Sequence, residues 1–353
     1  MKISRKLKIT AAALAVAMAV SAMPASIGMM ASASEPAVTQ AARAAISQKL
    51  VDQNLGARAM NNSYSYIDSA SVNRFTGNLA ATTWLPNPTD IADFSMGITY
   101  NAQDTRNNGF GNGVSAFFSE HITELSVTEL AFTDETGTTF YFTRQMSSNY
   151  YFDDMGRQIT LLGDGTFRLD DGGIGSNYRI FRADGKLSYV YRNTFHGWKA
   201  YMSYNDDGTI YQVDIISMDN RTGNSFRYEY YTAPGAATPR VSKITSGNTA
   251  GTVYTFGYDA AGNLTNIISG AVDVSMQYTN GLMTKYVNNT TRDNINVTYS
   301  AIDGLNRVTR MNKTNLSGSI IKDIQFAYAN GQTVVIEDGS MSIISYDENG
   351  MVV

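Results

Sequence analysis

The stretch Tyr258-Asp259-Ala260-Ala261-Gly262-Asn263-Leu264-Thr265 shows how the second half of this chain is built. An aromatic residue precedes a polar turn that closes on glycine, and a polar and an aliphatic residue follow. The glycine can adopt positive φ without a Cβ clash, and an Asp or Asn side chain in the turn can accept a backbone N–H two residues on. The stretch therefore predicts a strand, a tight turn and a second strand that pairs with the first.

Imperfect copies of this stretch recur at intervals of about 20 to 30 residues, which is typical of stacked supersecondary units. The residues that we assign to repeat turns, with a structural role only, are Phe181, Gly185, Tyr204, Gly208, Tyr258, Asp259, Gly262, Tyr346, Asp347 and Gly350. Weaker copies start at Ile302 and Tyr328, and Tyr228–Ile244 forms a divergent unit. We expect the leading aromatic rings to stack on their counterparts in neighbouring hairpins.

Composition favours an all-β protein with a substantial core. Of the 353 residues, 43% are hydrophobic and only 16% are charged, and the chain holds 22 Tyr, 15 Phe and 30 Gly. Aromatic and β-branched residues between Gly and Asn turns are typical of strands. Cysteine is absent, which excludes disulfides, thiolate metal sites and a Cys nucleophile.

The first 33 residues have the features of an export signal. Basic residues precede the apolar run Ile9–Val20, and Ala31-Ser32-Ala33 forms an Ala-x-Ala cleavage site. The alternative is an uncleaved anchor, because Ile9–Met30 is almost long enough to span a bilayer. Cleavage would leave an acidic, secreted or cell-wall-associated chain, so we expect no nucleic-acid partner and no membrane contact beyond the signal.

The rest of the chain divides into three regions. Residues 34–72 predict one short helix, at Val38–Gln53, followed by a polar linker. Residues 73–149 form a β block without clear copies of the repeat, and residues 150–353 contain the hairpin repeats. The predicted fold is an all-β array of antiparallel β-hairpins that forms an open, curved or spiralling sheet, preceded by the short helix.

The repeat resembles the YD repeat of the Rhs family, which takes its name from the dipeptide found here at Tyr258-Asp259 and Tyr346-Asp347. Thr76–Leu79 and Phe110–Gly113 resemble the opening segment of such proteins, although Val114 stands where Trp is usual. The resemblance covers residues 73–353 and implies a long antiparallel sheet, which in relatives encloses a toxin or sits on an adhesion protein. An alternative identity follows from it: the N-terminal shell portion of an Rhs-type polymorphic toxin whose effector is absent from this chain.

Catalytic chemistry has little support in the sequence. His121 and His196 are the only histidines, which argues against a histidine-rich metal cluster, and no Gly-x-Ser-x-Gly elbow occurs. The acidic pairs Asp153-Asp154 and Asp206-Asp207 fall in predicted turns, where Asp is expected to bond to the backbone. We therefore predict no enzyme and no cofactor, with a glycosidase as a remote alternative.

Two binding sites remain as expectations. Asp170 and Asp171 lie in an acidic, Gly-rich segment that is the candidate for a bound calcium ion, although it lacks the EF-hand pattern. Trp198 and Tyr201 are the candidates for stacking on sugars, whereas the closely spaced Tyr189 and Tyr191 are expected on the buried face. The function that follows is an exported, non-enzymatic scaffold that binds cell-wall or host-surface polysaccharide, or another surface protein.

Overall fold

The computed structural model describes residues 64–171, 177–194, 196–234, 236, 238–247, 252–329, 331–347 and 352–353. Within these residues the chain is all-β, without a helix, and its strands form a five-stranded and a 21-stranded sheet. The pairing of successive strands is antiparallel, so the predicted all-β hairpin array is confirmed. The predicted export signal, the helix at Val38–Gln53 and Gly350 lie outside the described residues. No helix in the described part is long and apolar enough to cross a membrane.

The chain forms two compact units. The large unit is Ala80–Asn294, and the small unit combines Met1–Leu79 with Ile295–Val353. The strands mainly in the large unit are β3 (Leu79–Leu85), β4 (Met96–Asn101), β5 (Val114–Ala116), β6 (His121–Ser126), β7 (Glu129–Thr133), β8 (Thr139–Thr143), β9 (Tyr150–Phe152), β10 (Gln158–Leu161), β11 (Phe167–Asp170), β12 (Asn177–Phe181), β13 (Leu187–Arg192), β14 (Trp198–Tyr204), β15 (Ile210–Ser217), β16 (Gly223–Tyr231), β17 (Arg240–Ser246), β18 (Val253–Tyr258), β19 (Leu264–Ser269), β20 (Val272–Thr279) and β21 (Leu282–Asn288).

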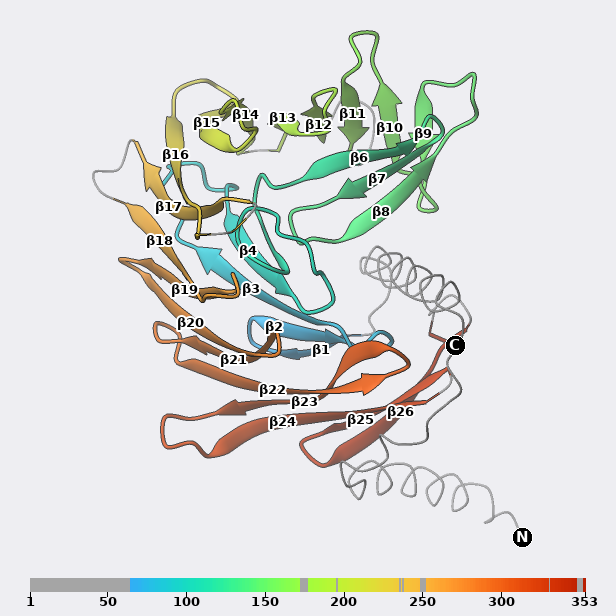
Figure 1. Cartoon of the computed structure of the whole chain (residues 1–353), viewed down its shortest axis with the longest axis vertical. Coiled ribbons are helices and arrows are strands. Elements are labelled where there is room, and N and C mark those ends of the chain that lie inside the picture. The colour runs from blue at the N-terminus through green and yellow to red at the C-terminus, as the bar shows by residue number, and fades with distance from the viewer. Residues whose placement is uncertain are drawn as a thin grey trace. The chain divides into compact units, whose positions relative to one another are not determined.

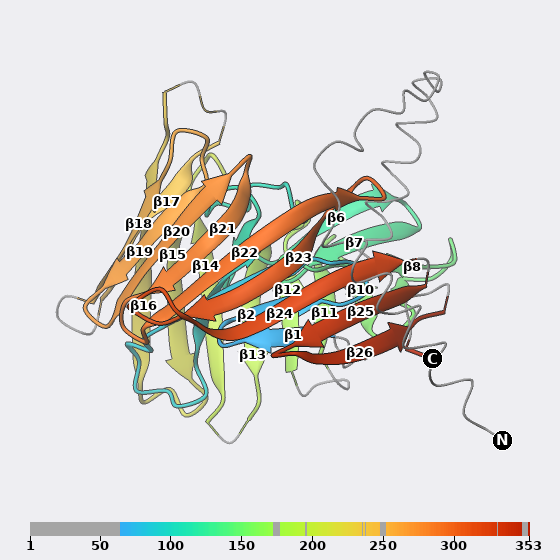
Figure 2. The same cartoon turned by 90° about the horizontal axis from the view of Figure 1, so that it is seen from below.

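In the large unit, successive hairpins build a curved sheet with an inner and an outer face (Figures 1 and 2). Side chains of a strand point alternately to its two faces. In β14, Trp198, Ala200 and Met202 are buried, while Tyr201 and Ser203 are exposed. We call the side of the buried residues the inner face and the opposite side the outer face.

The inner face packs against residues 80–118, which we call the inner block. Figure 1 shows β3 and β4 lying inside the curve of β6–β21. The Phe94 ring lies 5.5 Å from Trp198 and 5.8 Å from Phe226, measured between ring centroids. The hydroxyl of Tyr254 donates to the carbonyl oxygen of Pro86 at 2.6 Å. The core of the large unit therefore joins segments that are far apart in sequence.

The Gly/Asn-rich loop at 107–113 docks directly on the repeat turn of Tyr258–Thr265. The backbone N–H of Asn112 donates to the carbonyl oxygen of Gly262 at 3.3 Å, and its side-chain amide donates to Ala261 at 3.0 Å. A Cβ on Gly111, where φ is +99°, would lie 2.8 Å from the Gly262 oxygen. Glycine at position 111 thus permits both the backbone conformation and the close approach.

The small unit contains a short hairpin that the sequence did not predict. The hairpin consists of β1 (Tyr64–Ile67) and β2 (Ala70–Asn73). The other strands of the small unit are β22 (Asp293–Ile302), β23 (Leu305–Thr314), β24 (Ile320–Ala329), β25 (Gln332–Glu337) and β26 (Ser340–Ser345). The first strand that the structure describes begins at Tyr64, inside the expected polar linker, and its hairpin buries Tyr64, Ile67 and Val72. Arg307 donates to the carbonyl oxygen of Phe75 at 3.0 Å, which joins the residues that follow this hairpin to β23.

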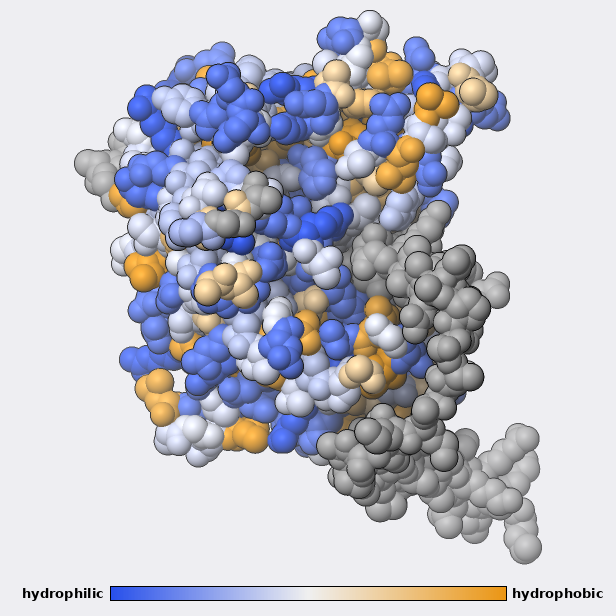
Figure 3. All heavy atoms as spheres, viewed as in Figure 1, coloured by the Kyte–Doolittle hydropathy of each residue, from blue (hydrophilic) through white to orange (hydrophobic). Residues whose placement is uncertain are grey.

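The surface is largely polar. Figure 3 shows one face on which hydrophilic residues are interspersed with small apolar areas, one of them toward the upper right, in the region of β6–β10. Exposed apolar side chains in that part of the chain include Leu125, Val127 and Met146.

Candidate functional site

The glycines of the repeat turns have the predicted left-handed conformation. Gly185 and Gly208 have φ of +80°, and Gly262 has φ of +89°. Each glycine donates its N–H to the carbonyl oxygen of the residue three positions earlier, at 2.9 to 3.0 Å. The carboxylate of Asp259 accepts both the backbone and the side-chain N–H of Asn263, at 2.9 and 2.8 Å. These residues therefore form the tight turns by backbone geometry and local hydrogen bonds.

The leading tyrosines are held by hydrogen bonds to the backbone of the preceding strand. Tyr258 donates to the carbonyl oxygen of Val241 at 2.7 Å, and Tyr278 donates to that of Leu264 at 2.8 Å. Tyr204 donates in the same way to Leu187. Burial raises the pKa of all three hydroxyls, so they remain protonated donors. These bonds link one repeat to the next.

A basic residue completes two of these links. Lys186 and Arg240 stand immediately before the acceptors Leu187 and Val241, and each lies 5.8 Å from the ring centroid of the bound tyrosine. Both basic side chains also pack closely against the glycine of the next turn. A Cβ on Gly208 would lie 1.8 Å from Lys186 Nζ, and one on Gly262 would lie 2.0 Å from Arg240 Nη2.

The sequence distances between basic residue, tyrosine and glycine are identical in the two copies. The glycine thus serves both the turn and the packing of the basic side chain.

The remaining repeat residues that the structure describes are also structural. Phe181 is fully buried, with its ring 5.8 Å from Phe132. Tyr346 is 7% exposed and lies 5.0 Å from Phe75 in the small unit.

The candidate calcium ligands are paired with arginines. Asp170 bonds to Arg168 at 2.7 Å, and Asp171 bonds to Arg192 at 3.0 Å and also to Arg179. Because guanidinium groups neutralise both carboxylates, neither is free to balance the charge of a cation. In the described part of the chain, no group of three or more His, Asp or Glu side chains is arranged to hold a metal ion.

Four tyrosines form a continuous row on the outer face, which we call the tyrosine row. Tyr178 lies on β12, Tyr189 and Tyr191 lie on β13, and Tyr201 lies on β14. Ring centroids are 4.8 Å apart for Tyr178 and Tyr191, 5.8 Å for Tyr178 and Tyr189, and 4.9 Å for Tyr189 and Tyr201. Tyr201 is 44% exposed and the other three are partly exposed.

Polar contacts hold the rings of Tyr178, at the end of the row, and Tyr189, at its centre, in place. The Arg168 guanidinium stacks over the Tyr178 ring at 4.2 Å while it bonds to Asp170. Partial burial raises the pKa of the Tyr189 hydroxyl, as do its interactions with Tyr178 and Tyr201 on either side. The rings are therefore positioned before any ligand arrives.

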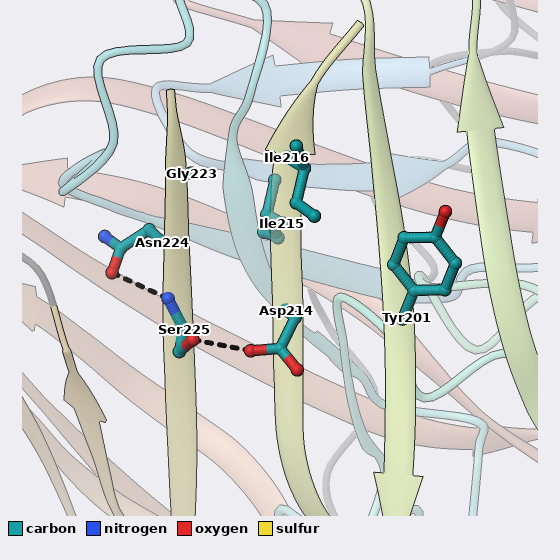
Figure 4. A pocket seen from close by; sticks show the side chains of 7 residues that line it. All are labelled: Tyr201, Asp214, Ile215, Ile216, Gly223, Asn224 and Ser225. Carbon is teal, nitrogen blue, oxygen red and sulfur yellow. Dashed lines mark hydrogen bonds between the residues drawn. The ribbon is translucent and has the colours of Figure 1, made fainter. Parts of the chain in front are cut away.

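A shallow pocket of about 460 Å³ continues the row onto β15 and β16 (Figure 4). Tyr201, Asp214 and Ser225 are directly opposite one another in the strand register. Ser225 donates its hydroxyl to Asp214 Oδ1 at 2.5 Å, and Gln212 donates its amide to the same oxygen at 2.8 Å. The pocket thus places a carboxylate and a hydroxyl beside an exposed ring.

Two sequence expectations about aromatics need correction. Trp198 is only 5% exposed, because it points to the inner face and packs against Phe94 and Phe117, so its ring is not available to a sugar. Tyr189 and Tyr191, expected to be buried, lie on the outer face. A β-bulge where Phe181 pairs with Leu187 changes the alternation, so that Leu187 and Val190 are both buried.

Alternation within β14 was the signal that could have placed Trp198. The apolar residues Ala200 and Met202 share its side of the strand, whereas Lys199 and Ser203 share the side of Tyr201.

No family model and no curated protein matches this chain. Among solved structures, it is similar to TcdB2-TccC3 without the hypervariable C-terminal region, with 11% identity, a TM-score of 0.33, and coverage of 76% of this chain and 18% of that chain. It is also similar to the Tc holotoxin pore of Photorhabdus luminescens, with 11% identity, a TM-score of 0.28, and coverage of 80% and 20%. A porin-like protein from Bacteroides uniformis matches with 11% identity, a TM-score of 0.28, and coverage of 64% and 91%. The chain spans about a fifth of the length of the two toxin chains.

Proposed function

We propose that this chain is an exported YD-repeat scaffold whose tyrosine row binds a glycan chain of a cell wall or host surface, without catalysis. The observation that supports the proposal is the row itself: four tyrosines side by side on the outer face, with one 44% exposed. Isolated exposed aromatics are common on protein surfaces, whereas contiguous aromatic surface is typical of binding sites.

The geometry of the row suits an extended polymer. Adjacent strands lie about 4.8 Å apart, so a row that crosses the strands offers a new ring at each step. The C–H face of a sugar packs on an aromatic ring, and the sugar hydroxyls need hydrogen-bond partners at the edge. Asp214, Ser225 and Arg168 border the row and supply acceptors and donors of this kind. A shallow, open site favours a long chain that lies across the surface over a small ligand enclosed by it.

The competing occupant of the row is a surface protein, since tyrosine and arginine are also enriched at protein interfaces. Co-sedimentation of the full chain with insoluble polysaccharides, including peptidoglycan and chitin, separates the two occupants. The glycan proposal requires sedimentation with at least one polysaccharide, and requires Tyr189→Ala and Tyr201→Ala to reduce it. Absence of binding across a broad glycan panel removes the glycan function.

A further inference from the structure

A second cleft, of about 510 Å³, lies within the large unit on the side of the repeat turns. We call it the Glu120 cleft. Its lining comes from the inner block, from the start of β6 and the segment that leads into it, from the β12–β13 turn, and from β14–β17 with their turns. The aromatic and ionisable residues of the lining include Phe118, Glu120, His121, Lys186, Tyr228 and Tyr230. A volume of this size is typical of small-molecule sites.

Two backbone hydrogen bonds and one side-chain hydrogen bond hold the cleft open before any ligand binds. Ile122 N–H donates to the carbonyl oxygen of Gly185 at 2.8 Å, and Val241 N–H donates to that of Gly109 at 2.8 Å. The Asn107 side chain donates to the Thr238 hydroxyl at 2.8 Å. These three bonds attach the lining segments to the sheet, so binding would require little ordering of the chain.

Glu120 is the unusual group in this lining. It is 4% exposed, and its Oε2 atom has no hydrogen-bond partner. Its other oxygen, Oε1, is 3.5 Å from Nε of Arg179, a guanidinium shared with Glu135 and Asp171. A buried carboxylate oxygen without a donor is costly, and native proteins rarely leave one unsatisfied.

The charges around the cleft favour a cation. Asp184 and Asp207 line it together with Glu120, whereas Lys186 is the basic counterpart in the lining. The Lys186 ammonium is already engaged, since it lies over the Tyr204 ring. Burial lowers the pKa of His121, which keeps that side chain neutral at pH 7.

We propose that the Glu120 cleft binds a small organic cation, an amine or amidinium on an apolar body, whose N–H donates to Glu120 Oε2. Phe118 and Tyr228 supply apolar and aromatic surface for the body of the ligand. Aromatic rings beside a carboxylate are the combination that recognises ammonium groups. This site is separate from the tyrosine row and does not depend on the glycan proposal.

The test uses benzylamine and its neutral counterpart benzyl alcohol as probes, titrated into the full chain by calorimetry at pH 8. Benzylamine binds at least about tenfold more tightly than benzyl alcohol, because a charge-assisted hydrogen bond exceeds a neutral one. Glu120→Gln removes this preference. Equal affinities, no binding of benzylamine, or a preference that survives in Glu120→Gln overturns the proposal.

Further variants distinguish a local effect on benzylamine binding from a general loss of folding. Thr238→Trp places a bulky ring in the exposed part of the lining and weakens benzylamine binding by about tenfold, whereas Thr238→Val, which removes only the hydroxyl bonded to Asn107, weakens it less. Asp273→Asn, at an exposed position of β20 outside both sites, leaves it unchanged. If Thr238→Trp binds as the unmodified chain does while its circular dichroism is native, benzylamine binds elsewhere and the assignment of the cleft fails.

The affinity for benzylamine also depends on pH. Burial and the nearby Glu135 raise the pKa of Glu120 to about 7, against the attraction of Arg179. Asp134 adds a smaller repulsion in the same direction. Benzylamine therefore binds more weakly at pH 6 than at pH 8, because the carboxyl is protonated at the lower pH. An affinity that is unchanged between these pH values contradicts the role of Glu120.

Discussion

The hydroxyl of Tyr258 donates a hydrogen bond of 2.7 Å to the carbonyl oxygen of Val241, in the strand before its own. The residue before this acceptor is Arg240, whose guanidinium group lies over the Tyr258 ring and packs closely against Gly262. One tyrosine therefore connects two strands and a turn. Tyr204 repeats the relationship with Leu187, Lys186 and Gly208.

We predict that Tyr258→Phe lowers the free energy of unfolding by about 1 kcal/mol, the typical net contribution of one hydrogen bond. The loss leaves the Val241 carbonyl without this donor while the ring still fills its space. Urea denaturation of the purified chain measures the change. Tyr211→Phe is the matched control, since Tyr211 is 44% exposed, and it changes stability by less than about 0.5 kcal/mol. Equal effects of the two substitutions contradict the role of the hydroxyl.

A second prediction separates the two requirements on the turn glycine. Gly281 has φ of +79° and open space around it, so Gly281→Ala costs only the backbone strain, about 1–2 kcal/mol. Gly262→Ala costs more, because its Cβ also collides with Arg240. Combining Gly262→Ala with Arg240→Ala relieves the collision, so the two effects are not additive in a double-mutant cycle. Strict additivity would show that the Arg240 contact is not tight.

Stability depends on pH through the carboxyls around Arg179. Burial and Glu135 raise the pKa of Glu120 to about 7 and that of Asp134 to about 6, above their unfolded values. The folded state then binds more protons than the unfolded state between about pH 4.5 and 7, so these groups favour folding less as pH rises through that window. We expect the stability of the unmodified chain relative to Glu120→Gln to fall by about 1–3 kcal/mol from pH 5 to pH 8. A difference that is constant or rises with pH contradicts the burial of an ionisable Glu120.

We also predict that the packing of the inner block is essential for the stability of the large unit. Phe94 is 2% exposed among Trp198, Phe117 and Phe226, so Phe94→Ala leaves a cavity and destabilises the large unit by about 3–5 kcal/mol. Thermal denaturation followed by near-ultraviolet circular dichroism reports the loss of this aromatic packing. Trp84→Ala serves as the control, because Trp84 is 63% exposed, and a similar loss in that variant would count against a core at Phe94.

The sequence was sufficient to predict the hairpin array, because turn chemistry at Gly185, Gly208 and Gly262 is local. It did not predict the contacts of Phe94 with Trp198 and Phe226 or the docking of the loop at 107–113, since these join segments more than a hundred residues apart. It also misplaced Tyr189, because a bulge opposite Leu187 shifts the alternation that the prediction relied on. The tyrosine row depends on register between strands, which periodicity within one strand does not determine.

The most direct test of the central proposal compares two equally exposed tyrosines. The dissociation constant of the full chain for a soluble fragment of the bound polysaccharide is measured by calorimetry for Tyr201→Ala and Tyr211→Ala. Tyr201 is part of the row and Tyr211 is outside it, yet both are 44% exposed. We expect Tyr201→Ala to weaken binding by about fivefold, from the loss of about 1 kcal/mol of aromatic packing, and Tyr211→Ala to have no effect. Equal dissociation constants for the two variants would contradict a glycan site on the tyrosine row.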